Sequence, residues 1–332
     1  MSPEALQDLL GELGQPAFRA RQILDWIYRK GVADPAAMTN LALPLREMLG
    51  RRLRVGGTVE RAVRSEDNAA AKYLFRLTDD EAVEAVSMTE RGRHTVCLSS
   101  QAGCAMGCAF CATAGMGFIR NLTAGEILLQ AVTLHRQEAP VNNVVFMGMG
   151  EPLLNLDPVL RAVDALVDPR RMGLGTRRIT ISTCGIAPGI RELAHHTTPV
   201  RLALSLNSPF QDQRAELMPV ARKHPLAEVL AACGEFVQAT GRRVLMEYVL
   251  LHGVNTSHDA AEALAEIARD LGGKVNLIEY NPVPGLPFAS PERKETHDFR
   301  AWLEARGVTV TIRFRRGRTI AAGCGQLATE RR

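Results

Sequence analysis

The sequence predicts an α/β fold built on a parallel sheet. Behind a short cysteine-rich loop, helical segments alternate with strand-like runs almost to the end of the chain, and this alternation is typical of repeated βα units. The 332 residues are enough for one large α/β domain and a small additional unit. The pattern leaves open whether the sheet is open or closes into a full or partial barrel.

Residues 1–55 predict a small helical unit. Ser2 precedes Pro3, as at a capped helix start with proline in the first turn. Apolar residues then recur at helical spacing from Phe18 to Tyr28, and residues 41–49 predict a third short helix. We expect this unit to be an accessory to the catalytic core.

From residue 57 to residue 99 the pattern changes to the period of two that is typical of strands. Strand-like runs cover residues 73–77, 82–88 and 95–98. We assign residues 56–92 to a β extension that precedes the main domain.

The main domain is expected over residues 93–315. Its predicted helices are 123–137, 157–167, 226–239, 257–271 and 292–306. Its predicted strands are 143–147, 178–182, 200–205, 244–250, 275–278 and 308–312. Polar residues just past strand ends line the active sites of such folds. Here those residues are Gly150, Glu151, Ser182, Asn207 and Asn281.

The most informative motif is the spacing Cys104-x3-Cys108-x2-Cys111. Three such thiolates can hold three irons of a 4Fe–4S cluster, and without a fourth cysteine nearby one iron stays open. S-adenosylmethionine can chelate that iron, and an electron passed into its sulfonium releases a 5′-deoxyadenosyl radical. The alternative is a zinc site, which usually has paired Cys-x2-Cys halves or a nearby histidine pair. Only one such half is present, and the nearest histidine, His94, lies on a predicted strand.

Three strand ends supply candidate ligands for S-adenosylmethionine. Glu151 follows the first strand after the cysteine loop, where a methionyl ammonium group would need an acceptor. Ser182 and Asn207 are candidate partners for its carboxylate and ribose hydroxyls. Taken alone, the glycines around residue 150 would more often form a tight turn.

Two further cysteines are candidates for chemistry. Cys324 lies beyond the last βα unit in a glycine-flanked segment that we expect to be mobile, which favours a nucleophile. A structural cysteine normally lies in an apolar helix or strand, as we expect for Cys233. Cys97 directly precedes the cluster loop and should lie near the barrel mouth, although a core position is its alternative. Cys184 is interpreted as structural.

The composition is that of a globular protein with 46% hydrophobic residues and seven cysteines. The odd count, with three cysteines in one loop, argues against a secreted disulfide framework. No apolar run has the length of a membrane span, and no signal peptide is recognisable. We therefore expect a cytoplasmic protein that does not contact membranes.

The net charge is +4, and the arginines gather in two groups. Such groups are either a nucleic-acid footprint or a solvated basic surface, because the guanidinium fork matches phosphate. The first group is Arg51, Arg52, Arg54, Arg61 and Arg64. The second group is Arg313, Arg315, Arg316, Arg318, Arg331 and Arg332.

Several motifs in order identify a family. The matching runs are residues 18–23, 26–28, 97–104, the cluster motif, 117–122, 147–155, 281–285 and 324–327. Together they closely resemble the RlmN-type RNA methyltransferases, which are radical-SAM enzymes that methylate carbon 2 of adenosine in ribosomal and transfer RNA. The resemblance spans nearly the whole chain.

This resemblance implies a fold and a set of cofactors. The fold would be a partial TIM-type (β/α)6 radical SAM barrel with a small N-terminal helical domain, a short β extension and a C-terminal loop, residues 316–332. A 4Fe–4S cluster would bind Cys104, Cys108 and Cys111. S-adenosylmethionine would serve twice per turnover, as methyl donor and as radical source. Its binding residues would be Gly150, Glu151, Ser182, Ser205, Leu206, Asn207 and Asn281.

The resemblance also implies roles for three further residues. Cys324 would be methylated, and its S-methyl group would lose a hydrogen atom and add to carbon 2 of adenine. Glu84 would remove the ring proton, although a solvated strand carboxylate is the alternative for this residue. Cys97 would then attack the sulfur of Cys324, releasing the product and forming a transient disulfide.

The expected partners are 23S rRNA, certain transfer RNAs and a reductant such as flavodoxin or ferredoxin, with the protein itself a monomer. The target base must be unstacked to reach the site. Two alternatives remain: a carbon-8 methyltransferase of the Cfr type, and a non-catalytic metal-bound RNA-binding protein. Asn207, Thr319 and Gly323 depart from residues common in the family, which are histidine, aspartate and alanine. Asparagine can still hydrogen-bond a ligand, Thr319 weakens inference about how the loop is anchored, and Gly323 favours mobility.

Overall fold

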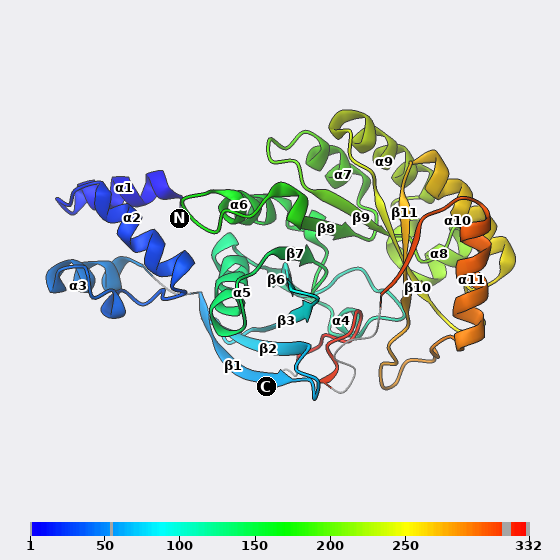
Figure 1. The fold of residues 1–332 in the computed structure, drawn as a ribbon, viewed down its shortest axis with the longest axis horizontal. Helices are drawn as coiled ribbons and strands as arrows, with labels where there is room; N and C mark the ends of the chain where they lie inside the picture. Colours follow the sequence, from blue (N-terminus) through cyan, green and yellow to red (C-terminus); the bar gives the residue numbers. More distant parts are fainter. Residues whose placement is uncertain (1, 54–55, 314–319, 330–332) are drawn as a thin grey trace.

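A curved ten-stranded sheet carries the fold in the computed structural model, which describes residues 2–53, 56–313 and 320–329 (Figure 1). The strand order is β1-β2-β3-β4-β7-β8-β9-β10-β11-β12. The strands from β4 to β12 pair in parallel, whereas β1 to β4 pair antiparallel. The ten strands are β1 Gly57–Arg64, β2 Ala70–Leu77, β3 Ala82–Glu90, β4 Arg93–Cys97, β7 Asn143–Phe146, β8 Ile179–Thr183, β9 Arg201–Ser205, β10 Leu245–Leu250, β11 Lys274–Glu279 and β12 Val310–Arg313.

Helices cover the convex side of the parallel strands (Figure 1). The helices after β4 are α4 Ala112–Gly115, α5 Ala124–Gln137, α6 Leu156–Val167, α7 Ala187–Ala194, α8 Gln211–Leu217, α9 Leu226–Thr240, α10 His258–Asp270 and α11 Arg293–Ala305. The sheet ends at β12 on one side and continues into the antiparallel β1–β3 on the other. The expected partial barrel with a β extension is therefore confirmed. This decides between the open sheet, the full barrel and the partial barrel, among which the sequence pattern did not choose.

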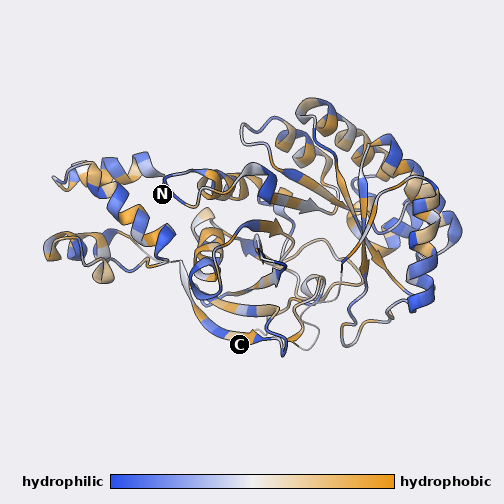
Figure 2. Cartoon of the chain, viewed as in Figure 1, coloured by the Kyte–Doolittle hydropathy of each residue, from blue (hydrophilic) through white to orange (hydrophobic). Residues whose placement is uncertain are grey.

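Local sequence explains why these elements form. The side chain of Thr123 accepts the backbone N–H of Glu126, and Glu126 reaches back to the N–H of Thr123, a capping box that starts α5. All five residues of β8 are buried, as expected for a parallel strand that is covered on both faces. Figure 2 shows apolar residues along the strands and hydrophilic residues on the outer turns of α10 and α11.

The N-terminal unit lies beside the barrel (Figure 1). Its helices are α1 Pro3–Glu12, α2 Phe18–Leu24 and α3 Leu43–Arg52, with a π-helical turn at Asp25–Arg29 that continues α2. Its contacts with the core include an ion pair of Glu4 with Arg170 at 2.9 Å and a hydrogen bond from Arg136 to the carbonyl of Gly31 at 3.3 Å. Among the described residues, no helix combines the length and the apolar character needed to cross a membrane.

The long elements lie close to the predicted ranges, but several short ones do not appear in the sequence pattern. Sequence reasoning missed β1, α4, α7 and α8, as well as the small two-stranded sheet of β5 Gln101–Gly103 and β6 Phe118–Asn121. These segments are short or polar, so their periodicity is weak. The pair β5–β6 matters for function because it brackets the cysteine loop.

Candidate active site

Cys104, Cys108 and Cys111 lie on the loop between β5 and α4, at the carboxyl end of β4. All three line one cavity of about 160 Å³. Burial raises the pKa of the Cys104 thiol to about 11 and raises that of Cys108 further. A bound cation is therefore what would keep these thiols deprotonated.

The geometry of the loop argues against the zinc alternative. Thiolates around one tetrahedral Zn²⁺ lie about 3.8 Å apart, since each Zn–S bond is about 2.3 Å. Within the described ranges, one set of three ligating side chains has donor atoms all within 4.8 Å, and that set is the exposed His258, Asp259 and Glu262 rather than the cysteines. The cysteine sulfurs are thus spread too widely for a single ion, and the donor set fits a larger cluster.

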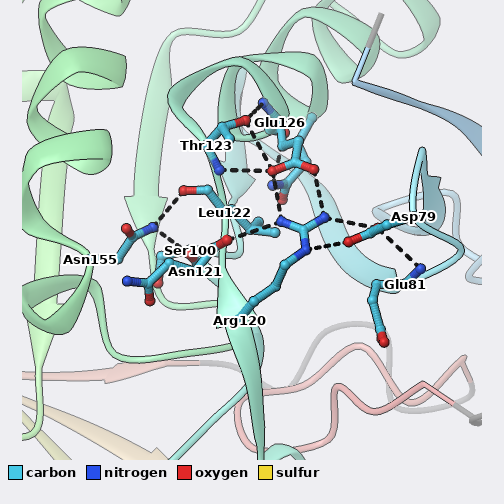
Figure 3. Close-up of polar contacts among 10 residues, drawn as sticks. Asp79, Glu81, Ser100, Arg120, Asn121, Leu122, Thr123, Glu126 and Asn155 are labelled. Carbon is cyan, nitrogen blue, oxygen red and sulfur yellow. Dashed lines mark hydrogen bonds and ion pairs between the residues drawn. The ribbon is translucent and has the colours of Figure 1, made fainter.

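A network of charged groups holds β6, which follows the cysteine loop (Figure 3). The guanidinium of Arg120 bonds both oxygens of Asp79, on the β2–β3 turn, and both oxygens of Glu126. Arg120 lowers the pKa of Asp79 by hydrogen bonding. For Glu126, burial alone would raise the pKa, but Arg120 and the Thr123 N–H bring it below its ordinary value. Asn155 adds two hydrogen bonds at 2.7 and 2.8 Å, to the carbonyls on either side of the loop (Figure 3).

The strand end after β7 is packed directly against β5. Gly150 has a φ of +96°, and a Cβ there would lie 2.5 Å from Cβ of Gln101. Only glycine fits this position without strain. Gln101 also accepts the N–H of Glu151 at 2.9 Å. The carboxylate of Glu151 is almost fully buried, lines the cavity and accepts the N–H groups of Leu153 and Cys184.

Four of the predicted cofactor-binding residues meet at the same cavity, together with Gly150. They are Glu151, Ser182, Ser205 and Asn207. The hydroxyls of Ser182 and Ser205 lie 3.3 Å apart. Cys184, interpreted from sequence as structural, lines this cavity as well.

Asn207 occupies a left-handed conformation with a φ of 57°, which asparagine tolerates better than most residues. Its Oδ1 accepts the N–H of Val249 at 2.9 Å. Leu206 is fully buried, and its N–H and carbonyl are used by Glu247 and Arg214. Asn207 therefore lines the cluster cavity, whereas Leu206, predicted to bind the cofactor, lines neither cavity.

Cys97 and Cys324 line a second cavity, of about 440 Å³. Cys97 is the last residue of β4, as expected from its place before the cluster loop. Burial raises the pKa of its thiol to about 12. Cys324 also lines the cluster cavity, as do Met147, Glu247 and Ile278, so it lies at the boundary between the two spaces.

Arg313, at the end of β12, lies inside this second cavity. Its Nη1 is 3.7 Å from Sγ of Cys324 and 3.3 Å from Sδ of Met147. Burial raises the pKa of the Cys324 thiol, and Arg313 opposes that rise. Arg313 therefore does not belong to a solvated basic surface, one of the two alternatives for its arginine group, because β12 directs it toward the thiols.

Asn281 also lines this second cavity rather than the cluster cavity. Its Nδ2 donates to the carbonyl of Cys324 at 3.4 Å, and its buried Oδ1 has no partner. Gly323 packs against it so closely that a Cβ would lie 2.4 Å from the amide.

The segment carrying Cys324 is anchored by hydrogen bonds, contrary to the mobility that its glycines suggest. The N–H of Ala112 donates to Gly325 at 2.7 Å, and the hydroxyl of Thr113 donates to Leu327 at 2.6 Å. Gln326 donates to the carbonyl of Pro282 at 3.0 Å. Helix α4, which directly follows the cluster motif, therefore holds the cysteine segment.

Glu84 lies on β3 and is 2% exposed, so the solvated alternative for this residue is wrong. Strand register places it on the same face as Cys97: Val86, two residues along, is the direct partner of Cys97. Its carboxylate binds Lys72 and the N–H of Ala328. Glu84 lies beneath the C-terminal segment and does not line either cavity.

The arginine groups are only partly described. Arg51 and Arg52 end α3 and are exposed, and Arg61 is exposed on β1. Arg64 is paired with Glu138 at 2.5 Å. The remaining members, together with Thr319, lie outside the described residues: Arg54, Arg315, Arg316, Arg318, Arg331 and Arg332.

Sequence reasoning missed four polar residues of the site: Lys72, Gln101, Asn155 and Glu247. Glu247 is buried, lines both cavities and accepts a hydrogen bond from Asn276 at 2.7 Å. A charged residue inside a predicted buried strand was the available signal for Glu247. The other three acquire their partners only through tertiary packing.

Comparison with known proteins places this geometry in a family. Residues 98–267 match the family model described as Radical SAM superfamily, and residues 1–55 match the Ribosomal RNA large subunit methyltransferase N-terminal domain. A probable dual-specificity RNA methyltransferase RlmN of Symbiobacterium thermophilum is 46% identical, over 98% of this chain and 90% of its own length. The dual-specificity RNA methyltransferase RlmN of Anaeromyxobacter dehalogenans is 44% identical, over 98% and 90%.

A solved structure agrees with these relatives. The crystal structure of a radical SAM methyltransferase from Sphaerobacter thermophilus superposes with a TM-score of 0.96 at 44% identity. The match covers 98% of this chain and 97% of that chain. The similarity therefore includes the N-terminal unit and the β extension as well as the barrel.

Proposed function

The chain belongs to the RlmN family of radical SAM RNA methyltransferases, and from that membership we propose that it methylates carbon 2 of adenosine in 23S rRNA and in certain transfer RNAs. It is an S-adenosylmethionine-dependent enzyme that acts on RNA. The relatives carry the RlmN name, so the carbon-8 alternative is not favoured.

One observation carries the proposal: Cys97 and Cys324 line one cavity, and Cys324 also lines the adjoining cavity of the cluster cysteines. A cysteine between the two spaces can receive a methyl group on one side and deliver it on the other. A structural metal site or a simple RNA-binding module would not need this pair.

The residues present fit both cofactors that the family implies. Cys104, Cys108 and Cys111 would hold the 4Fe–4S cluster and leave one iron open. Glu151 would accept the methionyl ammonium, with Gly150, Ser182, Ser205 and Asn207 lining the same cavity. Leu206, buried next to Asn207, and Asn281, from the adjoining cavity, would complete the proposed S-adenosylmethionine site. When bound, the cluster and S-adenosylmethionine would supply the radical chemistry that removes a hydrogen atom from the S-methyl group and the one-electron redox chemistry that the addition to the base requires.

The chain's own residues would perform the remaining steps. The Cys324 thiolate attacks the methyl carbon of one S-adenosylmethionine, forming an S–CH3 bond while the bond from that carbon to the sulfonium breaks and S-adenosylhomocysteine leaves. After the methylene carbon has bonded to carbon 2, Glu84 takes the ring proton. Cys97 forms an S–S bond to Cys324 while the bond from Sγ to the methylene carbon breaks. The electron pair of that bond stays on carbon, which takes up a proton and becomes the methyl group.

We further propose how the substrates reach the site. The N-terminal unit and the exposed arginines of α3 and β1 would bind phosphates of folded RNA, with the target adenine unstacked into the 440 Å³ cavity. Two S-adenosylmethionine molecules per turnover, a flavodoxin or ferredoxin reductant, a monomeric state and a cytoplasmic location complete the proposal.

Anaerobic reconstitution with iron and sulfide, followed by nucleoside analysis of added RNA, tests the function. We expect 2-methyladenosine; exclusive formation of 8-methyladenosine would contradict the proposal. Cys324→Ala should abolish methyl transfer with the cluster intact, and Cys97→Ala should leave a covalent RNA–protein adduct on a denaturing gel. Cys233→Ala is the matched control, because Cys233 is buried in α9 away from both cavities.

A further inference from the structure

Two hydrogen-bond donors hold the carboxylate of Glu84, one on each oxygen. Nζ of Lys72 lies 2.9 Å from Oε1. The backbone N–H of Ala328 donates to Oε2 at 3.1 Å. The two donors come from different parts of the chain, a strand of the β extension and the segment that carries Cys324.

Strand register explains why Lys72 reaches Glu84. Leu74 is the direct partner of Glu84 in the antiparallel pair of β2 and β3, and Lys72 lies two residues before Leu74. Lys72 and Glu84 are therefore diagonal neighbours on one face of the sheet, a separation that a long side chain can span. The Lys72 side chain is itself only 14% exposed, so water screens this ion pair weakly.

The backbone of Glu84 is fixed as well. The hydroxyl of Ser99 donates to its carbonyl at 2.6 Å, and its N–H points to Sδ of Met149 at 3.3 Å. Both contacts come from residues next to the cluster loop and the Gly150 turn. The carboxylate is thus held at a fixed place relative to the cofactor site.

The electrostatics show what Lys72 supplies. Burial raises the pKa of Glu84, while Lys72, the Ala328 N–H and, more weakly, Arg61 on β1 lower it. The effect of burial is the larger one, so the pKa of Glu84 stays above its ordinary value, and a base must be ionised when the proton arrives. Of these groups, Lys72 is the one that carries a positive charge and lies in direct contact with the Glu84 carboxylate.

The donor on Oε2 belongs to the segment that must rearrange. Ala328 lies four residues after Cys324, and Leu327, between them, lines the substrate cavity. Because this segment covers the carboxylate of Glu84, a substrate can reach Oε2 only after Ala328 moves away. Withdrawal frees Oε2 and leaves Oε1 on Lys72.

We propose that Lys72 is a positioning residue for the proposed base: it holds Oε1 of Glu84 in its ionised form, so that Oε2, which Ala328 occupies in this structure, is the atom that accepts the ring proton. The inference rests on the proposed function of Glu84. The proton passes from carbon 2 to Oε2, and its electron pair stays with the ring, so no further reactant is required.

The test uses reconstituted holoenzyme whose Cys324 is already methylated, in single turnovers with RNA across a range of pH. Lys72→Met should move the midpoint of the acidic limb about one to three pH units higher, since that is the effect of losing an opposite charge at this distance. Lys72→Arg should restore the wild-type midpoint. With deuterium at carbon 2 of the target adenine, Lys72→Met should show a larger isotope effect than wild type, because proton removal becomes the slower step.

Arg76→Gln is the matched control, because Arg76 lies on the same strand and face and loses a comparable ion pair, with Glu60 at 2.6 Å. An unchanged midpoint and isotope effect in Lys72→Met, or an equal shift in Arg76→Gln, would overturn the proposal. If wild-type enzyme forms 2-methyladenosine in those experiments, the proposed function stands even where the role of Lys72 fails. Failure of the proposed function and failure of the Lys72 proposal are therefore distinguishable. Full activity of Glu84→Gln would show that Glu84 is not the base and would thereby exclude the proposed role of Lys72.

Discussion

Replacing Arg313 by methionine should slow the methylation of Cys324. The substitution keeps most of the side-chain volume but removes the guanidinium that lies 3.7 Å from Sγ. Arg313 is the group that opposes the effect of burial on the pKa of this thiol, so its loss raises that pKa further. At a given pH below the pKa, less of the reactive thiolate is then present.

The magnitude follows from two opposing effects. An opposite charge at this range changes a pKa by about one to three units, so the thiolate fraction falls about 10- to 1,000-fold. A thiolate with a higher pKa is a better nucleophile, with a Brønsted coefficient of about 0.4–0.5, which offsets close to half of the loss on a logarithmic scale. The net slowing should be about 3- to 60-fold.

Mass spectrometry of Cys324 after timed exposure of cluster-loaded enzyme to S-adenosylmethionine measures this step alone. The rate in Arg313→Met should continue to rise at alkaline pH values where wild type has levelled off, and Arg313→Lys should recover part of it. Equal rates and equal pH profiles for wild type and Arg313→Met, with the cluster spectrum unchanged, would refute the reasoning.

Three further perturbations test the scaffold of the site. Gly150→Ala should lower stability by about 2–5 kcal/mol, from the left-handed backbone and the collision with Gln101; an unchanged melting temperature would contradict this close approach. Asn155→Ala leaves the buried carbonyl of Leu122 without a donor, while the carbonyl of Ser100 keeps the Leu122 N–H, and should cost about 1–3 kcal/mol in denaturant unfolding. The pKa of Glu126 is lowered below its ordinary 4.5, so the ion pair with Arg120 contributes stability above that pH and loses it as the folded carboxyl protonates. Unfolding midpoints of wild type and Arg120→Gln should therefore converge in acid, and a constant difference would contradict the ion pair's role.

The long helices and strands of the barrel could be predicted from the sequence, because their patterns of buried and exposed residues are regular. Every predicted strand of the barrel reappears within a few residues, from Asn143–Phe146 to Val310–Arg313. Whether the sheet is open or closes into a barrel could not be predicted from the pattern, since both architectures have the same βα alternation. It was the resemblance to a family that selected the partial barrel.

The gathering of Cys104, Cys108 and Cys111 at one cavity was predictable, because a single short run of sequence contains all three. Partners brought together by the sheet were not, because register between strands has no local signal. Lys72 is one case, and Arg313 is another: in sequence it belongs to a run of arginines, yet it ends β12 beside the thiols. The expected mobility of the Cys324 segment failed for a related reason, since glycine content says nothing about Thr113 and its bond to Leu327.

The bonds from α4 to the cysteine segment have a consequence for damaged enzyme. Ala112 and Thr113 directly follow the last cluster cysteine, and they fix the backbone on either side of Gln326. Iron lost to air would loosen this helix, and the methyl carrier would lose its docking in the same event. Oxidised molecules should then lose both half-reactions together, the methylation of Cys324 and the transfer of the methyl group to RNA. They should not continue to consume S-adenosylmethionine by methylating a cysteine that cannot transfer the methyl group.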